Sequence, residues 1–151
     1  MARAANWVAA IFAAIGVSAC SRSAPPAASA PSRYSAGQVW KYQTRPGEEN
    51  SRVIVCRVDD SEAGRVLHIK IIGLNVKNPR APSGKTAELP HAPISEKAFE
   101  ASVIELMKEP GDSSGYEAGY EQWKAAKGGV FSISVSEIVG HIEKAINEGA
   151  S

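Results

Sequence analysis

The side chains of this chain best suited to chemistry are two cysteines and three histidines. His68, His91 and His141 lie far apart in the sequence, outside any His-Glu-x-x-His or Cys-x-x-Cys pattern that would hold a metal ion. They could still meet in the folded chain, but their spacing does not argue for it. The sequence therefore predicts no catalytic residue, no metal site and no cofactor.

Cys20 is the one residue whose surroundings specify a reaction. Arg3 is followed by an uncharged stretch from Trp7 to Ala19, which ends in Val17-Ser18-Ala19-Cys20. The stretch is shorter than the roughly 20 apolar residues that a membrane-spanning helix needs. A positive start, a short apolar segment and small residues before the cysteine resemble the signal peptide and lipobox of bacterial lipoproteins.

That resemblance implies that residues 1–19 are removed and that fatty acids such as palmitate are attached at Cys20. A residue other than aspartate after the cysteine, here Ser21, favours the outer membrane, with the protein facing the periplasm. Residues 20–33 are rich in alanine, proline and serine and are expected to form a disordered tether. The alternative is an ordinary cleaved signal peptide with an incidental cysteine.

The charge of the chain limits its partners. Lysine and arginine number 17 against 16 aspartate and glutamate residues, and no block of like charges occurs. Nucleic acid is therefore an unsuitable partner, because no basic stripe is available to neutralise a phosphate backbone. We expect contact with the membrane through the N-terminal lipid and with a protein or another envelope component through the folded part.

Residues 34–151 read as one α+β domain. We expect a small antiparallel sheet of three to four strands, with helices packed on one face and the other face partly wet. The expected order is β-β-β-α-α-β-α, with a long proline-rich connection at 74–94 between the third strand and the first helix. The expected strands cover 39–44, 52–58, 65–73 and 130–133, and the expected helices cover 95–108, 115–127 and a segment capped by Ser134 and Glu137.

Three other features have a structural interpretation. Cys56 alternates with apolar residues and is expected to be a buried, inert thiol, without a disulfide partner if Cys20 carries lipid. The carboxylates of Asp59-Asp60 are expected in a solvated turn. Tyr116, Tyr120 and Trp123 recur at helical spacing, which favours a place in the core over a ligand platform.

The loops are the best candidates for recognition, because loops on a rigid scaffold commonly carry binding residues. The candidate partner-binding residues lie in a turn and in the proline-rich segment: Arg45, Glu48, Lys77, Asn78, Arg80, Lys85 and His91.

Two further stretches, Trp40-x-Tyr42-x-Thr44-Arg45-Pro46-Gly47-Glu48 and Pro90-His91-x-Pro93-Ile94-Ser95, resemble small uncharacterised bacterial envelope domains with no established activity. The leading hypothesis is a non-enzymatic, lipid-anchored periplasmic binding domain. One alternative is an immunity or inhibitor lipoprotein that blocks a toxin or cell-wall hydrolase. The other is an envelope enzyme whose site is assembled from distant residues such as His91 and a turn carboxylate.

Overall fold

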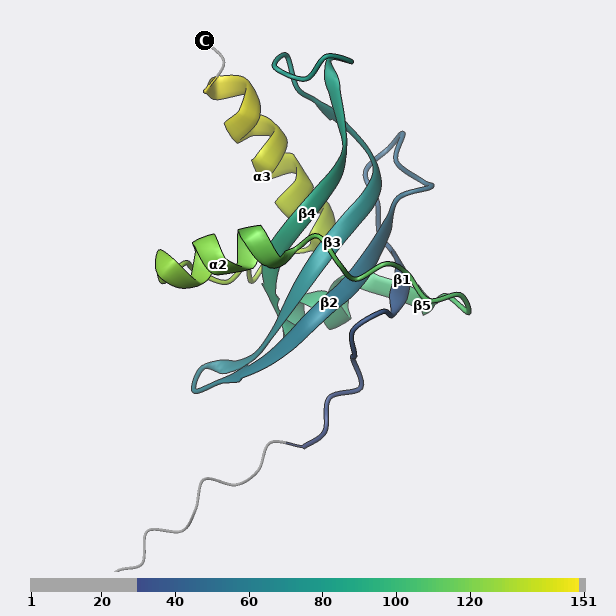
Figure 1. The fold of residues 1–151 in the computed structure, drawn as a ribbon. Coiled ribbons are helices and arrows are strands. Elements are labelled where there is room, and N and C mark those ends of the chain that lie inside the picture. The colour runs from purple at the N-terminus through teal and green to yellow at the C-terminus, as the bar shows by residue number, and fades with distance from the viewer. Residues whose placement is uncertain (1–29, 150–151) are drawn as a thin grey trace, which may run out of the picture.

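The computed structural model describes residues 30–149, so the signal peptide, Cys20 and most of the tether expected from the sequence lie outside the described residues. The described chain is an α+β fold with a five-stranded antiparallel sheet in the order β4-β3-β2-β1-β5 and three helices (Figure 1). The elements are β1 (Val39–Tyr42), β2 (Arg52–Ser61), β3 (Gly64–Lys77), β4 (Lys85–Ser95), α1 (Glu96–Ser102), β5 (Val103–Leu106), α2 (Glu117–Ala125) and α3 (Val135–Glu148). None of the helices described is long and apolar enough to cross a membrane.

The three strands expected at the start of the domain are confirmed. They correspond to β1, β2 and β3, and β3 lies inside the sheet, paired with β2 on one side and with the edge strand β4 on the other. The chain contacts this fold from the first residue described: the Ala30 carbonyl accepts a hydrogen bond from Arg65, Ser32 donates to Glu96 and Arg33 donates to Glu100. Buried Tyr34 follows at once.

The connection expected at 74–94 is wrong, because most of it is strand. β3 continues to Lys77, and β4 starts at Lys85 after a short turn. The prolines misled the sequence interpretation: Pro90 and Pro93 lie in β4, which is an edge strand of the sheet. A proline is tolerated at an edge because no neighbouring strand needs its missing N–H.

The helix expected at 95–108 is correct only in its first half. Ser95 caps α1, as predicted, by accepting a hydrogen bond from the Ala98 amide. The helix then ends at Ser102, and Val103–Leu106 pairs with β1 as β5. The pairing gives this β-branched segment backbone partners at the open edge of the sheet, which outweighs its helical spacing.

The later elements agree with expectation except for one strand. α2 lies within the expected helix at 115–127, and α3 begins with the expected capping box of Ser134 and Glu137. The strand expected at 130–133 is reduced to a single bridge between Phe131 and Ile94. The α+β class is therefore confirmed, but the observed order is β-β-β-β-α-β-α-α.

The main core lies between one face of the sheet and two helices, α1 and α3. Phe99 of α1 is fully buried, with its ring edge-on to Tyr34 and Trp40. The other members come from the sheet and from α3: Tyr42, Val53, Val55, Leu67, Ile69, Ile71, Leu74, Val76, Ala92, Ile94, Val135, Ile138 and Val139.

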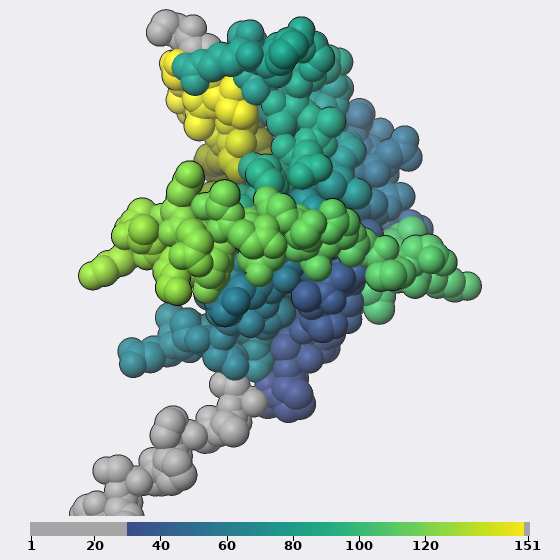
Figure 2. Space-filling view, viewed as in Figure 1, coloured from purple at the N-terminus to yellow at the C-terminus, as the bar shows by residue number. Residues whose placement is uncertain are grey.

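The opposite face of the sheet is also covered, so the expectation of helices on one face is wrong. α2 lies in front of the sheet and α3 behind it (Figure 1), and the segment between β5 and α2 crosses the strands (Figure 2). Gly111 of that segment packs so closely that an added Cβ would lie 2.6 Å from a Val39 methyl carbon. His68 and Lys70, expected on a partly wet face, are therefore buried.

Replacing Phe99 with alanine is expected to lower the free energy of unfolding by about 3–5 kcal/mol, because it leaves a cavity between α1 and the sheet. Urea unfolding measures the loss. Ile104→Ala is the matched control, since Ile104 is 64% exposed and its truncation should change stability by no more than about 0.5 kcal/mol. Equal losses in the two variants would contradict this packing.

Candidate functional site

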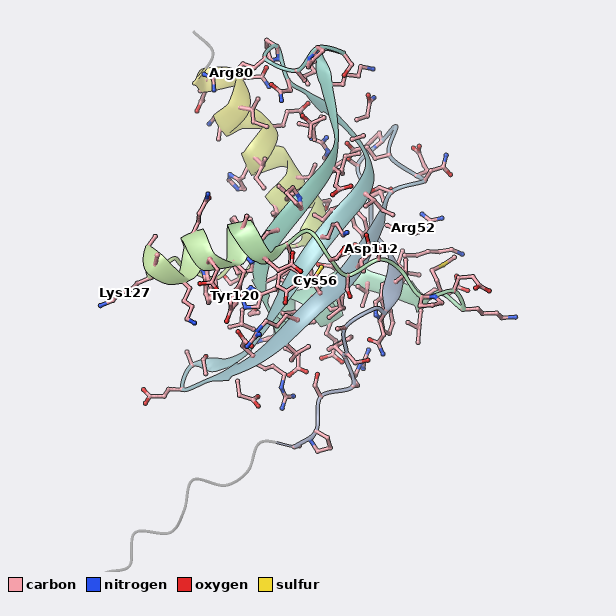
Figure 3. The ribbon with its side chains drawn as sticks, viewed as in Figure 1. Arg52, Cys56, Arg80, Asp112, Tyr120 and Lys127 are labelled. Atoms are coloured by element: carbon pink, nitrogen blue, oxygen red, sulfur yellow. The ribbon has the colours of Figure 1, made fainter. Side chains whose placement is uncertain are left out.

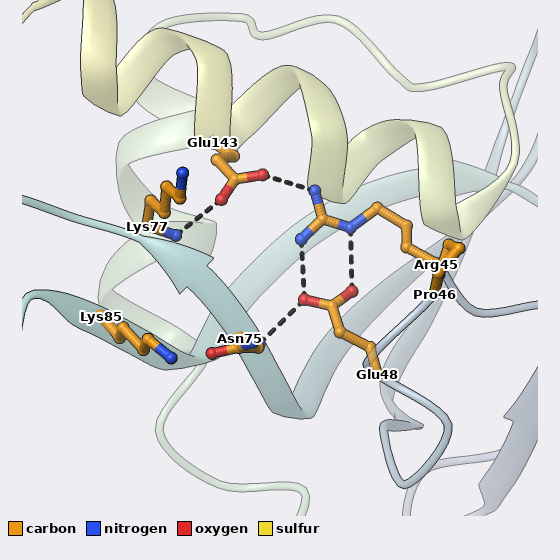
Figure 4. A pocket seen from close by; sticks show the side chains of 7 residues that line it. All are labelled: Arg45, Pro46, Glu48, Asn75, Lys77, Lys85 and Glu143. Atoms are coloured by element: carbon orange, nitrogen blue, oxygen red, sulfur yellow. Dashed lines mark hydrogen bonds and ion pairs between the residues drawn. The ribbon is translucent and has the colours of Figure 1, made fainter.

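Four of the seven candidate binding residues line one cavity of about 300 Å³ (Figure 4). Arg45 and Glu48 enter it from the turn between β1 and β2, while Lys77 ends β3 and Lys85 begins β4. Pro46, Asn75 and Glu143 complete the lining. The sequence hypothesis named the turn and the proline-rich segment as two separate candidates, and the fold brings residues of both to one cavity.

The turn that supplies Arg45 has the sequence of a tight reverse turn. Pro46 is followed by Gly47 at φ +85°, and the Glu48 amide donates to the Arg45 carbonyl at 3.1 Å. A proline with fixed φ followed by a residue at positive φ is the combination that a type II turn requires. The turn therefore folds Arg45 and Glu48 back on each other.

Arg45, which is partly buried, forms a two-pronged ion pair with the buried Glu48 carboxylate. Arg45 Nε donates to Glu48 Oε2 at 2.9 Å and Nη2 donates to Oε1 at 2.7 Å, while the Asn75 amide donates to the same Oε1 at 2.8 Å. Burial opposes ionisation of Glu48, but these hydrogen bonds outweigh it and lower the pKa of its carboxyl group. Glu48 is therefore a paired carboxylate and not a proton donor.

Glu143 ties α3 into the same network. Its carboxylate accepts the Lys77 amide at 2.6 Å and Arg45 Nη1 at 2.6 Å (Figure 4). The hydrogen bond from the Lys77 backbone amide is the main cause of the lowered pKa of the Glu143 carboxyl group. Arg45 thus donates from all three of its guanidinium nitrogens to two carboxylates. The network holds the turn, β3 and α3 together.

The lysines are the cations of this cavity that remain available. Lys77 and Lys85 are direct partners across the β3–β4 ladder, and both are exposed. Within residues 30–149, neither ammonium group has an ion-pair partner. Like charges directly opposite each other in a sheet repel, so the site holds two positive charges that an added anion would stabilise.

Asn78 and Arg80 lie beyond the lysines, in the turn that joins β3 to β4. Asn78 builds this turn: its side chain donates to Thr86 at 2.8 Å and accepts the Arg80 amide at 3.0 Å. Arg80 is exposed, and its guanidinium group lies beside Gly149 at the end of α3 (Figure 3). Asn78 therefore shapes the turn, while Arg80 adds a third cation to its surface.

His91 does not join this surface, although the sequence hypothesis grouped it there. It lies in β4 on the opposite side of the sheet from α3, and its Nε2 is 2.9 Å from Nδ1 of His68. Asp59 Oδ2 lies 3.4 Å from His68 Nε2 and accepts the Tyr120 hydroxyl at 2.9 Å. The sequence analysis missed His68 as a partner. The sequence signal that was available is the alternation along β3, which places His68 on the face of the sheet opposite to that of Leu67.

The aromatic stripe of α2 covers this histidine pair instead of entering the core. No residue of α2 is buried, and the Tyr120 and Trp123 rings each lie 4.8 Å from the His68 ring. The interpretation of these residues as core is therefore wrong. Asp59, expected in a solvated turn, is half-buried in β2 next to them.

Two other nucleophile candidates lie in places that do not favour reaction. Cys56 is buried, as expected, and burial raises the pKa of its thiol to about 11. Residues 111–115 have the spacing Gly-x-Ser-x-Gly of a hydrolase elbow, but they lie in the extended segment before α2 and not at a strand-to-helix turn. Among residues 30–149, no group of three or more histidine, cysteine and acidic side chains is arranged to hold a metal ion.

Comparisons with protein-family models, curated proteins and solved structures find no match to this chain.

Removing the guanidinium group in Arg45→Ala is expected to cost about 3 kcal/mol of stability, because it leaves the buried Glu48 carboxylate without its partner. The measurement is urea unfolding at neutral pH. Lys41→Ala serves as the control, since the Lys41–Glu105 pair is exposed and should contribute less than about 1 kcal/mol. A similar loss for both would show that the Arg45 network carries no special weight.

Proposed function

We propose that the chain is a lipid-anchored binding domain of the bacterial cell envelope that recognises an acidic surface of a partner protein. The anchor is the expected lipid on Cys20, and the recognition element is the basic tip, which we define as Lys77, Arg80 and Lys85. The proposal is of a non-enzymatic protein facing the periplasm, with the outer membrane favoured by Ser21.

The observation that carries the proposal is the excess of positive charge at the basic tip. All three side chains are exposed, and no acidic residue occurs between Val76 and Ala87. The Lys77–Lys85 pairing is repulsive in the free protein, so an acidic partner would gain from relieving it.

Rigidity of the tip supports the same proposal. Glu143 and Asn147 of α3 bond the backbone of Lys77, and Asn78 closes the turn. Little backbone entropy is then lost when a partner binds. The β3–β4 hairpin also extends past the body of the sheet (Figure 1), a shape that suits entry into an acidic cleft. An immunity or inhibitor lipoprotein that acts on a toxin or cell-wall hydrolase is the specific form of this proposal.

An envelope enzyme based on His91 and a turn carboxylate has one supporting observation. His68 connects His91 to Asp59, which are distant in sequence. The arrangement lies beneath Tyr120 and Trp123, however, and the cavity of about 300 Å³ is lined by other residues. Binding therefore remains the function that we propose.

Cys20→Ser is expected to abolish acylation and release the chain from membranes, because only a thiol forms the thioether to lipid. Metabolic labelling with a fatty acid and membrane fractionation measure the two effects. Cys56→Ser should leave both unchanged, since Cys56 is buried within β2. Continued labelling of the Cys20 variant would refute the anchor.

Reversing two tip charges, in Lys77→Glu/Lys85→Glu, is expected to lower the affinity for the partner at least tenfold. The partner is identified by placing a photo-crosslinking residue at Ser83, in the turn between these lysines, in cells that produce the full chain. Raising the salt concentration should also weaken binding, because exposed charges are screened.

The matched control reverses two exposed lysines elsewhere, in Lys97→Glu/Lys108→Glu, and should leave the crosslinked product unchanged. A second crosslinker at Ala63, in the opposite hairpin turn, should give no such product. Equal loss from both double variants would argue against a specific role for the basic tip.

A further inference from the structure

The His68–His91 pair is a polar contact buried between the sheet and α2. His68 is fully buried in β3, and its ring lies nearly parallel to that of His91 in β4, with an interplanar angle of 10° and a centroid distance of 5.2 Å. The 2.9 Å contact between His68 Nδ1 and His91 Nε2 requires one nitrogen to donate and the other to accept. The contact therefore needs at least one neutral imidazole, since two protonated rings would bring two N–H groups face to face.

α2 is held to the sheet through this pair and through Asp59, which accepts the Tyr120 hydroxyl. No residue of α2 is buried, and its Tyr120 and Trp123 rings contact His68. Gly119 lies against His91, where an added Cβ would be 2.7 Å from the His91 Cβ. The chain on either side of α2 has almost no regular structure. Local release of α2 can thus occur without unfolding the sheet.

Burial of the pair opposes added positive charge more strongly than the carboxylate beside it favours that charge. From β2, Arg57 donates to Asp59 at 2.6 Å and lies over the Tyr120 ring; from α2, Lys124 lies near the same ring. Lys70, further along β3, is bonded to the Ser114 carbonyl, with Asp112 nearby. Asp59 is the carboxylate nearest His68 but is already shared by Arg57 and Tyr120, and His68 Nε2 has no hydrogen-bond partner.

We propose that α2 is a proton-controlled cover: it is docked while the His68–His91 pair shares one proton, and protonation of the pair releases it from the sheet. Release exposes His68 and His91 on that face of the sheet, while α1 and α3 keep the main core closed. The proposal concerns the opposite side of the sheet from α3 and is independent of the function proposed for the basic tip.

The direction of the pH effect follows from burial. Burial lowers the pKa of His68 to about 4 and also lowers the pKa of His91. An exposed imidazole titrates near 6.5, so the released state takes up protons first as the pH falls. Docking is therefore fully favoured above about pH 6.5 and is lost as the pH falls from there toward about 4.

The experiment is amide hydrogen exchange, read by mass spectrometry, on the full chain in detergent at pH 7.5 and pH 5.0, corrected for intrinsic exchange rates. The opening equilibrium of α2 should rise roughly 10- to 30-fold at the lower pH. Amides of α3 report the main core and should keep their protection. Equal protection of α2 at both pH values, or joint loss in α2 and α3, would overturn the proposal.

Two pairs of variants separate the pair from general acid effects. The double variant His68→Gln/His91→Gln should remove the pH dependence of α2 exchange, whereas His141→Gln, at an exposed residue of α3, should keep it. Gly119→Ala should release α2 at both pH values, whereas Gly140→Ala, where a Cβ meets open space, should not. A double variant with the wild-type pH response would refute the proposal.

Discussion

Burial of β3 on both faces is the constraint on which the rest of the structure depends. Successive side chains of a strand point to opposite faces, so the part of β3 that is covered twice, Val66 to Ile71, buries every side chain. Leu67, Ile69 and Ile71 meet this requirement with apolar packing on α1 and α3. His68 and Lys70 meet it with polar partners, His91 and the Ser114 carbonyl. The polar clusters of the molecule therefore follow from the position of one strand.

Local rules predicted those parts of the fold that depend on neighbouring residues. The first three strands, the Ser95 cap and the Ser134 capping box are set by alternation and by contacts three residues apart. The errors concern positions relative to the whole sheet. Prolines are compatible with β4 only because it lies at an edge, and Val103–Leu106 is a strand only because β1 offers it a partner.

The candidate site shows the same division. The sequence offered Arg45, Lys77 and Lys85 as candidate binding residues in loops, and the fold places them around one cavity. Glu143 could not be found in this way, because it joins the site from α3, 98 residues after Arg45. His91 was misplaced, since its partner depends on the register between β3 and β4. Sequence thus identified the charges of the site but not the network that holds them.

The two polar clusters respond to acid in different pH ranges, which separates their roles. In the Arg45 network the carboxyl pKa values of Glu48 and Glu143 are lowered, so these ion pairs persist until the pH falls below the ordinary carboxyl range. As the pH falls, docking of α2 on the histidine pair weakens before these ion pairs break, because exposed imidazole takes up a proton at a higher pH than a carboxylate does. Mild acid should therefore act on α2 while the basic tip remains held by α3. A domain built in this way can change one face of its sheet without disturbing the hairpin that we propose for recognition.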